Sequence, residues 1–203
     1  MDDAVRSVPC KEFLMRLSPA ILPLSAAVLL SACGSAPQKS QPTPPPVVTT
    51  PVAQLAEANL APASASIVSG RLVLKTESGG VHLTGLVGGL QPMQQAGFHI
   101  HERGDCSAVD ASSAGNHFNP GGAAHGRAGT GKHHLGDMDN LRADAQGRAN
   151  VDIHLKGVTL GGGAATDIAG RALVVHANAD DYRSQPAGNA GVRIACGVIR
   201  VVR

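Results

Sequence analysis

The chain has 203 residues, enough for one ordinary domain together with a leader or a linker. Its formal net charge is only +2 and it contains no basic run, so we do not expect nucleic acid as a partner. With one Tyr, three Phe and no Trp, but 25 Gly among runs of Val, Ile and Leu, the composition is typical of short strands and tight turns.

The first part of the chain has the pattern of an export leader. Residues 16–32 show a basic residue, a short apolar run and then small residues, as in a secretory signal. Two prolines interrupt the run, which is too short for a comfortable transmembrane helix. Because Met15 gives a more typical signal start than Met1, we interpret residues 1–14 as an over-extended start.

The leader ends in LSAC, residues 30–33, which resembles the lipobox of bacterial lipoproteins, whose cysteine is lipidated. Cys33 is therefore the predicted lipid anchor and residues 1–33 the predicted signal segment. The alternative is a plain signal peptide with an incidental cysteine. Gly34 stands where an inner-membrane retention signal tends to place Asp, which favours the outer membrane. We expect the protein in the periplasm of a bacterial cell envelope, anchored to that membrane as a lipoprotein.

Residues 34–64 have the composition of a linker. They hold seven of the 13 prolines and almost no large apolar residues, as in PTPPPVVTTP. Such a segment is typical of an extended, polyproline-like tether. LAEANLA, residues 55–61, is compatible with a helical turn inside it. We therefore expect a disordered tether over residues 34–64 and a folded domain over residues 65–203.

From about residue 65 onward, apolar and polar residues alternate in short runs, which predicts strands. The first two runs are joined by ESGG, a hairpin-like turn. No segment has a sustained 3.6-residue period, so we expect an all-β domain, an antiparallel immunoglobulin-like β-sandwich or barrel with Greek-key connections. The predicted strands cover residues 66–76, 81–90, 97–101, 149–155, 171–176 and 192–202.

Two long Gly-rich stretches, residues 102–136 and 177–191, separate these strands. Long loops without secondary structure of their own are usually functional or disordered. Both stretches are rich in His, Asp or Arg, so we expect two long functional loops.

The segment GFHIH, residues 97–101, places two histidines in a strand pattern. Side chains at i and i+2 of a strand project from the same face, about 6.5–7 Å apart. His99 and His101 can therefore reach one ion together, while Phe98 and Ile100 face the core. The alternative is a pair of solvent-facing histidines on an edge strand.

More metal-type donors occur in the same part of the chain. Eight of the nine histidines lie between residues 99 and 176, and local clusters of His favour metal binding. Several imidazoles with one carboxylate suit zinc and copper rather than calcium or magnesium. Beyond the first pair, the candidates are His117, His125, His133, His134, Asp137 and His176.

Seven short motifs within residues 66–203 resemble, in their order along the chain, the copper–zinc superoxide dismutase family. They are GFHIHE, HFNP, HG at residues 125–126, HLGD, LVVH, ADD and GNAGVRIACGVI. Together with the leader, they are similar to the bacterial cell-envelope lipoprotein branch of that family. The resemblance implies an enzyme that converts superoxide to oxygen and hydrogen peroxide by alternate reduction and reoxidation of one copper ion per subunit, supported by one zinc ion.

The resemblance also implies a ligand role for each donor. His117 corresponds to the histidine that bridges both metals, which needs a ring with both nitrogens deprotonated. His134 is preferred over its neighbour His133 because the family pattern is His-x-x-Asp, and His133 is the alternative. The implied copper ligands are His99, His101, His117 and His176, and the implied zinc ligands are His117, His125, His134 and Asp137.

Three further residues receive roles from the same resemblance. Asp180 corresponds to the carboxylate that hydrogen-bonds one copper-ligand and one zinc-ligand histidine, with Asp181 beside it as the alternative. Arg193 corresponds to the arginine that holds the superoxide anion beside copper, and its always-charged guanidinium suits an anion. The alternative is a surface arginine on a terminal strand. With Arg193, His117 is the implied catalytic residue, because it takes a proton and returns it to the product.

The cysteines agree with an exported protein. Cys106 and Cys196 match the disulfide of the family, with two buried free thiols as the alternative. An oxidising envelope compartment permits such a bridge. Cys33 is accounted for by lipidation, and Cys10 lies in the over-extended start and has no assigned role.

The implied substrate, superoxide, is a small anion, so cations near the site affect the rate of its arrival. Lys132 and Arg183 are the candidates for this steering, beside Arg193. Family members include monomers and dimers, so a homodimer is one implied assembly. The alternative function is a non-catalytic envelope protein that binds copper and zinc or delivers copper, which should lack a ligand or the arginine. A purely structural β-sandwich leaves the clustered histidines unexplained.

Overall fold

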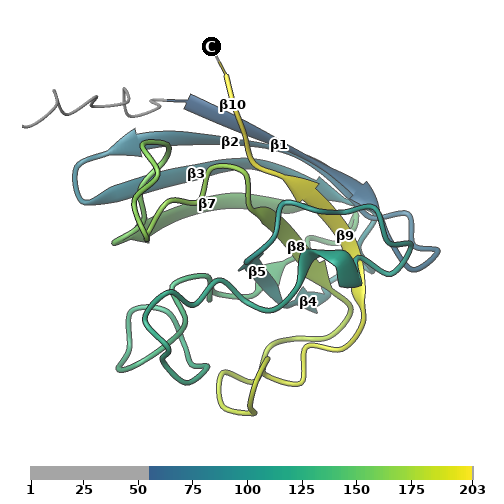
Figure 1. Cartoon of the computed structure of the whole chain (residues 1–203). Coiled ribbons are helices and arrows are strands. Elements are labelled where there is room, and N and C mark those ends of the chain that lie inside the picture. The colour runs from purple at the N-terminus through teal and green to yellow at the C-terminus, as the bar shows by residue number, and fades with distance from the viewer. Residues whose placement is uncertain (1–54, 203) are drawn as a thin grey trace, which may run out of the picture. The chain divides into compact units, whose positions relative to one another are not determined.

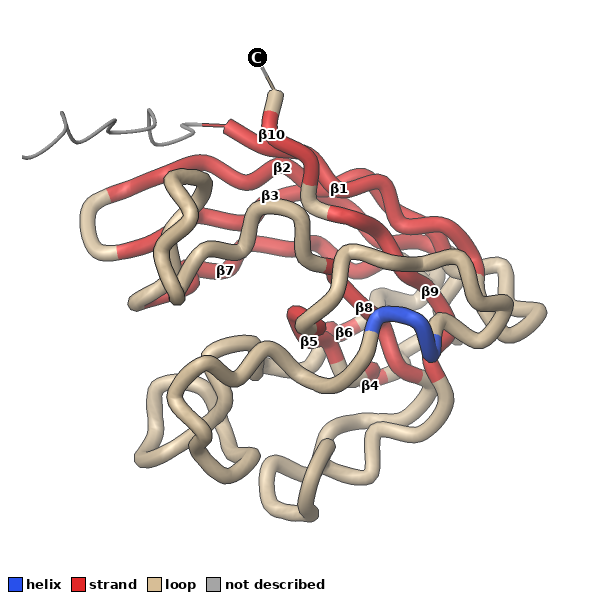
Figure 2. Tube along the Cα trace, in the orientation of Figure 1, coloured by secondary structure: helices blue, strands red, loops and turns tan. Residues whose placement is uncertain are grey.

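The computed structural model describes residues 55–202, which are almost entirely strands and loops (Figure 2). Eight strands form one antiparallel sheet in the order β5–β8–β9–β1–β2–β3–β7, with β10 beside β1, while β4 and β6 pair separately. The predicted signal segment, Cys33 and residues 34–54 lie outside the described residues. The strands are β1 (Leu55–Pro62), β2 (Ser69–Glu77), β3 (Gly80–Gly88), β4 (Gln95–Ala96), β5 (Phe98–His101), β6 (Leu141–Arg142), β7 (Ala149–Lys156), β8 (Ala172–His176), β9 (Arg193–Val198) and β10 (Arg200–Val201).

The sheet curls into two layers that β1 holds together. Most of β1 pairs with β2, whereas its last residues, Ala61 and Pro62, pair with β9. Strands β1, β2, β3 and β7 thus form one layer and β9, β8 and β5 the other (Figure 1). The chain crosses between the layers after β3, after β6 and after β7, as in a Greek key. This arrangement confirms the predicted antiparallel all-β sandwich or barrel.

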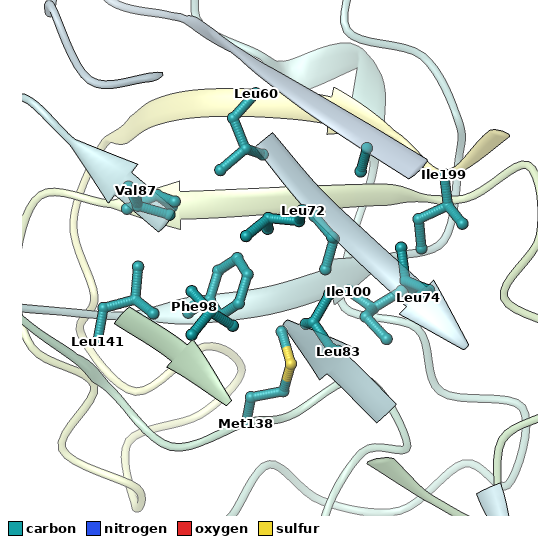
Figure 3. Packing of buried hydrophobic residues seen from close by; sticks show 14 of the residues in the cluster. Leu60, Leu72, Leu74, Leu83, Val87, Phe98, Ile100, Met138, Leu141 and Ile199 are labelled. Carbon is teal, nitrogen blue, oxygen red and sulfur yellow. The ribbon is translucent and has the colours of Figure 1, made fainter. Parts of the chain in front are cut away.

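The core lies between the layers and is almost wholly aliphatic (Figure 3). Leu72 and Leu74 of β2 and Leu83 of β3 are fully buried, and they share one cluster with Phe98 and Ile100 of β5. Burying a side chain of this size stabilises the fold by about 1.5–3 kcal/mol. Because alternate residues of a strand face opposite sides, this packing turns the two histidines of β5 away from the core, as predicted.

The predicted boundary between tether and domain is wrong. Residues 55–62 are strand β1, not part of a tether and not a helical turn. Ala56, Ala58 and Leu60 of this strand are buried in the core. Ala, Leu and Glu favour helices in isolation, but pairing with two neighbouring strands overrides that preference. The small side chains gave little hydrophobic signal, although they alternate with polar residues.

The six predicted strands are confirmed with small shifts, as β2, β3, β5, β7, β8 and β9. The last one, predicted over residues 192–202, is divided into β9 and β10, because Ile199 leaves the ladder and its amide donates to the carbonyl of Arg171. The short strands β4 and β6 and a 3-10 turn, Ser112–Ala114, were not predicted. This turn is the one helix among residues 55–202, and it is far too short to cross a membrane.

The position of β1 predicts where the domain can be truncated. A chain that starts at residue 65 lacks the strand that joins the two layers, so the edges of β2 and β9 lose their partners. We expect residues 55–203 to unfold cooperatively and residues 65–203 to show no cooperative transition, measured by circular dichroism during heating. Equal melting temperatures for the two proteins would contradict this account of β1.

Candidate metal centre

The edge of β5 that does not pair with β8 is covered by the first long loop, and this contact places the predicted donors side by side. The amide of Ile100 donates to the carbonyl of Gly136, and the amide of Phe118 donates to the carbonyl of Ile100. This irregular pairing sets His101 opposite His117 and His99 opposite Asp137. On the other edge of β5, strand β8 ends at His176 with a bulge. The backbone pairing alone therefore gathers residues that are far apart in the sequence.

The seven ligands that the family resemblance implies all lie within this centre, and all are buried. They form two groups in which the donor atoms lie within 4.8 Å of one another, and His117 belongs to both. The first group is His99, His101, His117 and His176, and the second is His117, His125, His134 and Asp137.

In the first group, backbone carbonyls decide which ring nitrogens carry hydrogen. His101 Nδ1 lies 2.8 Å from the carbonyl oxygen of Gly115, and His176 Nδ1 lies 3.1 Å from that of Gly191. A carbonyl oxygen only accepts, so both Nδ1 atoms donate and both Nε2 atoms keep bare lone pairs. These two Nε2 atoms face each other at 3.3 Å. Two buried acceptors at that separation are favourable only with a cation between them.

The other members of the first group show the same need. His99 Nε2 lies 2.8 Å from Asp180 Oδ2, so it donates and leaves Nδ1 bare. His99 Nδ1 and His117 Nε2 are buried and have no hydrogen-bond partner. Unpaired buried nitrogens are rare and costly in folded proteins. The four imidazoles therefore fit a metal ion at their common centre.

The second group is arranged around the carboxylate of Asp137. Its Oδ1 lies 2.8 Å from His117 Nδ1, 3.0 Å from His125 Nδ1 and 3.2 Å from His134 Nδ1. Its Oδ2 accepts the amides of Gly126 and His134, which fixes the carboxylate in place. Three imidazoles and one carboxylate form a donor set that suits a tetrahedral zinc ion. Because His117 turns Nδ1 to this group and Nε2 to the first, its ring has the geometry of a bridge.

Asp180 connects the two groups through hydrogen bonds to one histidine of each. Its fully buried carboxylate accepts from His99 Nε2 through Oδ2 and from His125 Nε2 at 2.9 Å through Oδ1. The neighbouring loop must approach closely, because a Cβ on Gly188, whose φ is +63°, would lie 1.8 Å from Asp180 Oδ1. The alternative, Asp181, is exposed and accepts from Ser184 in a turn instead.

The alternative zinc donor, His133, points away from both groups. Its Nδ1 lies 2.7 Å from the carbonyl oxygen of His134, and its Nε2 accepts the amide of Gly129. The structure thus places His134, and not His133, beside Asp137. Backbone carbonyls such as that of Gly115 are the part of the centre that residue types did not signal.

Burial keeps three of the imidazoles neutral, and hydrogen bonds keep Asp137 ionised. Burial lowers the pKa of His99 and His101 well below the usual value, and lowers the pKa of His176 to about 4. Burial alone would raise the pKa of Asp137, but hydrogen bonds from His117 and the Gly126 amide outweigh it and leave that pKa far below normal. Neutral imidazoles and an ionised carboxylate are the forms that bind metal.

A cavity of about 370 Å³ opens onto the first group. His101, His117 and His176 line it together with Arg193, which is the only Lys or Arg among the described residues that do so. The candidates Lys132 and Arg183 do not line it. Glu102 lines it as well. The cavity therefore presents one guanidinium beside the four-imidazole group.

Arg193 is held in place by the disulfide-linked loop. Its Nη1 donates to the carbonyl of Ala111 and its Nη2 to that of Gly115, both at 2.6 Å. The predicted disulfide between Cys106 and Cys196 is confirmed, with a Cα–Cα distance of 5.7 Å, and it ties this loop to β9. Because Gly115 also accepts from His101, one carbonyl oxygen fixes the arginine relative to the imidazoles.

The comparisons with known proteins agree with this geometry. The sequence model described as copper/zinc superoxide dismutase (SODC) matches residues 68–199. A protein of Aquifex aeolicus named superoxide dismutase [Cu-Zn] 2 is 44% identical over 136 residues, which are 66% of this chain and 80% of the relative. The solved structure of a double mutant of a SOD-like protein from Bacillus subtilis has a TM-score of 0.65 at 35% identity and covers 71% of this chain and 96% of its own. The solved structure of the clock protein EA4 has a TM-score of 0.67 at 35% identity, and the match covers 75% of this chain and 98% of EA4.

The disulfide predicts a large effect on stability. It closes a loop of 90 residues, and on the chain-entropy model such a bridge stabilises the fold by about 4–5 kcal/mol. We expect the double variant Cys106→Ala/Cys196→Ala to lose roughly that much free energy of unfolding, measured with urea. Reducing agent should destabilise the wild type and leave the variant unchanged, and a wild type indifferent to reduction would contradict the assigned role.

Proposed function

The chain belongs to the copper/zinc superoxide dismutase family, and from this membership we propose how its own residues serve that chemistry. As a family member it is an enzyme that uses copper and zinc and converts superoxide to oxygen and hydrogen peroxide. The observation that carries the proposal is the convergence of donor nitrogens from six buried histidines beside a cavity that Arg193 lines.

The two groups divide the metals by their donors. His99, His101, His117 and His176 offer four imidazole nitrogens and are assigned to copper. The assigned zinc ligands are His117, His125, His134 and Asp137. Copper, when bound, supplies the one-electron chemistry by alternating between two oxidation states, whereas zinc has no redox chemistry and organises the loop.

Arg193 binds the substrate. The two carbonyls of Ala111 and Gly115 use one N–H on each terminal nitrogen, and the guanidinium has five donors in all. Burial lowers its pKa, but an arginine at the edge of a cavity stays charged at neutral pH. Electrostatic steering of a small anion into a lined cavity is documented for superoxide dismutases. Among residues 55–202, Arg193 is the one Lys or Arg that lines this cavity, so we assign the steering charge to it.

His117 is the proposed proton donor to the product. Its Nε2 is buried, faces the first group and has no hydrogen-bond partner, so it can hold a proton there and give it to the product. Asp180 and the Gly115 carbonyl do not react. They keep His99, His125 and His101 in the tautomers that aim the bare nitrogens inward.

The alternative is a non-catalytic protein that binds copper and zinc or delivers copper. Such a protein needs the imidazoles but does not need a cationic side chain that binds an anionic substrate. The position of Arg193, fixed by two carbonyls and facing the cavity, favours catalysis.

We also propose that the enzyme works in the bacterial cell envelope. The leader, the lipobox-like LSAC and the Pro-rich residues 34–54 support a lipoprotein held to the outer membrane through Cys33 and a tether. A disulfide suits the oxidising periplasm, which supports the same location. A homodimer stays a prediction from the family resemblance.

Arg193→Ala should lower the rate with superoxide by roughly 10- to 100-fold and flatten its dependence on ionic strength, because the cation that attracts and holds the anion is gone. Pulse radiolysis at several salt concentrations measures both effects. The matched control is Arg183→Ala, which removes an exposed arginine outside the cavity and should keep most of the rate. Removing copper while zinc stays should abolish the activity of the wild type. Full activity without copper would refute the proposed function, and unchanged kinetics of Arg193→Ala would refute its role.

Cys33→Ser should release the protein from the membrane. If the cysteine carries the lipid, the wild type partitions into the membrane fraction and its N-terminal peptide has the mass of a lipid-modified cysteine. We expect the variant to lose both properties while it keeps its dismutase activity, because Cys33 lies outside the catalytic domain. Equal fractionation of the two proteins would contradict the anchor and leave the enzyme assignment untouched.

A further inference from the structure

Residues 55–202 hold one more group of metal-type side chains, formed by Glu77, His82 and His154. His82 of β3 and His154 of β7 stand directly opposite each other in the antiparallel ladder. Their sequence neighbours Val81, Leu83 and Leu155 are buried in the core, so the two imidazoles project from the outer face. The rings are stacked, with centroids 4.1 Å apart and planes 7° from parallel.

Glu77, at the end of β2, places its carboxylate against both rings. Oε1 lies 3.4 Å from His82 Nδ1, and Oε2 lies 3.4 Å from His154 Nδ1. Two ligands of a tetrahedral ion with bonds of about 2.1 Å are about 3.4 Å apart. The distances between the carboxylate and the rings are thus those of donors that share one ion.

Asp152 fixes the orientation of the first ring. Its Oδ1 lies 2.6 Å from His82 Nε2, so this nitrogen donates, and a neutral His82 keeps its bare lone pair on Nδ1, the atom nearest Glu77. A carboxylate behind a histidine is the usual partner of a metal-binding imidazole. Neither histidine was singled out from the sequence, because a cross-strand pair separated by 72 positions leaves no motif there.

We propose that Glu77, His82 and His154 form a surface site for a borderline divalent transition-metal ion such as Zn²⁺ or Cu²⁺. Two imidazoles and one carboxylate are a sufficient set of protein ligands for such an ion, and water completes the coordination. The side chains of Glu77, His82 and His154 are 37%, 24% and 63% exposed, so an ion reaches them directly from solvent. The site is independent of the ligands assigned to the buried centre.

Protons compete with the ion at this site. The hydrogen bond with Asp152 is the main cause that raises the pKa of His82, and Glu77 adds to it. Lys75 stands opposite His82 on β2, and Lys156 lies two residues beyond His154 on the same face of β7, so two ammonium groups balance the two carboxylates. Because the ion needs neutral imidazoles, its affinity rises with pH.

The test counts metal ions on the full chain already loaded with copper and zinc. We dialyse it against micromolar Zn²⁺ at pH 7.5 and measure bound metal by mass spectrometry. The wild type should bind three ions per chain and His154→Ala two, and Glu77→Gln should weaken the third ion at least tenfold. The matched control is Glu57→Gln, which changes a half-buried glutamate of β1 that pairs with Arg71 on the same sheet, and it should keep three ions.

Superoxide dismutation should be unchanged in all these variants, which separates this proposal from the proposed function. Titration with Cu²⁺ gives a second readout, because a second copper, bound at the surface site, has its own electron paramagnetic resonance signal, expected in the wild type and absent from His154→Ala. A wild type that stops at two ions, or a His154→Ala variant that keeps the third with wild-type affinity, would overturn the surface site.

Discussion

The rest of the structure depends on lone pairs that face inward at the buried imidazoles. Carbonyls of Gly115 and Gly191 and the carboxylate of Asp180 each take an N–H from the back of a ring, so the nitrogen at the front is bare. The bare Nε2 atoms of His101 and His176 lie 3.3 Å apart in a buried space, and two acceptors at that distance repel each other. Metal binding offsets this repulsion, because the free energy of binding adds to the stability of the fold. The centre is therefore both a functional site and a metal-dependent part of the core.

One carbonyl oxygen connects stability with catalysis. Gly115 accepts from His101 on one side and from Arg193 on the other. Its loop is held by the bridge between Cys106 and Cys196, which also closes β9 against the rest of the domain. The same covalent link that restricts the unfolded chain therefore keeps the guanidinium at a constant position relative to the copper-binding nitrogens, and a change in the loop alters both properties.

The sequence was sufficient where side chains carry a strong signal. Alternating Val, Ile and Leu predicted the strands, and histidine spacing with the family motifs predicted the donors that the structure brings together. It was not sufficient for β1, whose buried Ala56 and Ala58 give no hydrophobic run, nor for the two-residue strands β4 and β6. The carbonyl of Gly115 was equally invisible, because every residue has one. The contact between His82 and His154 was not predicted for another reason, since the two residues meet only through strand pairing.

The two kinds of site use the same side chains under opposite conditions. In the buried centre, burial lowers the pKa values of His99, His101 and His176, so protons are excluded from these donors and they stay ready for metal. On the face of β3 and β7, a solvated carboxylate raises the pKa of His82, so a proton competes with any ion. Burial thus favours permanent occupancy, whereas exposure favours exchange with the surroundings.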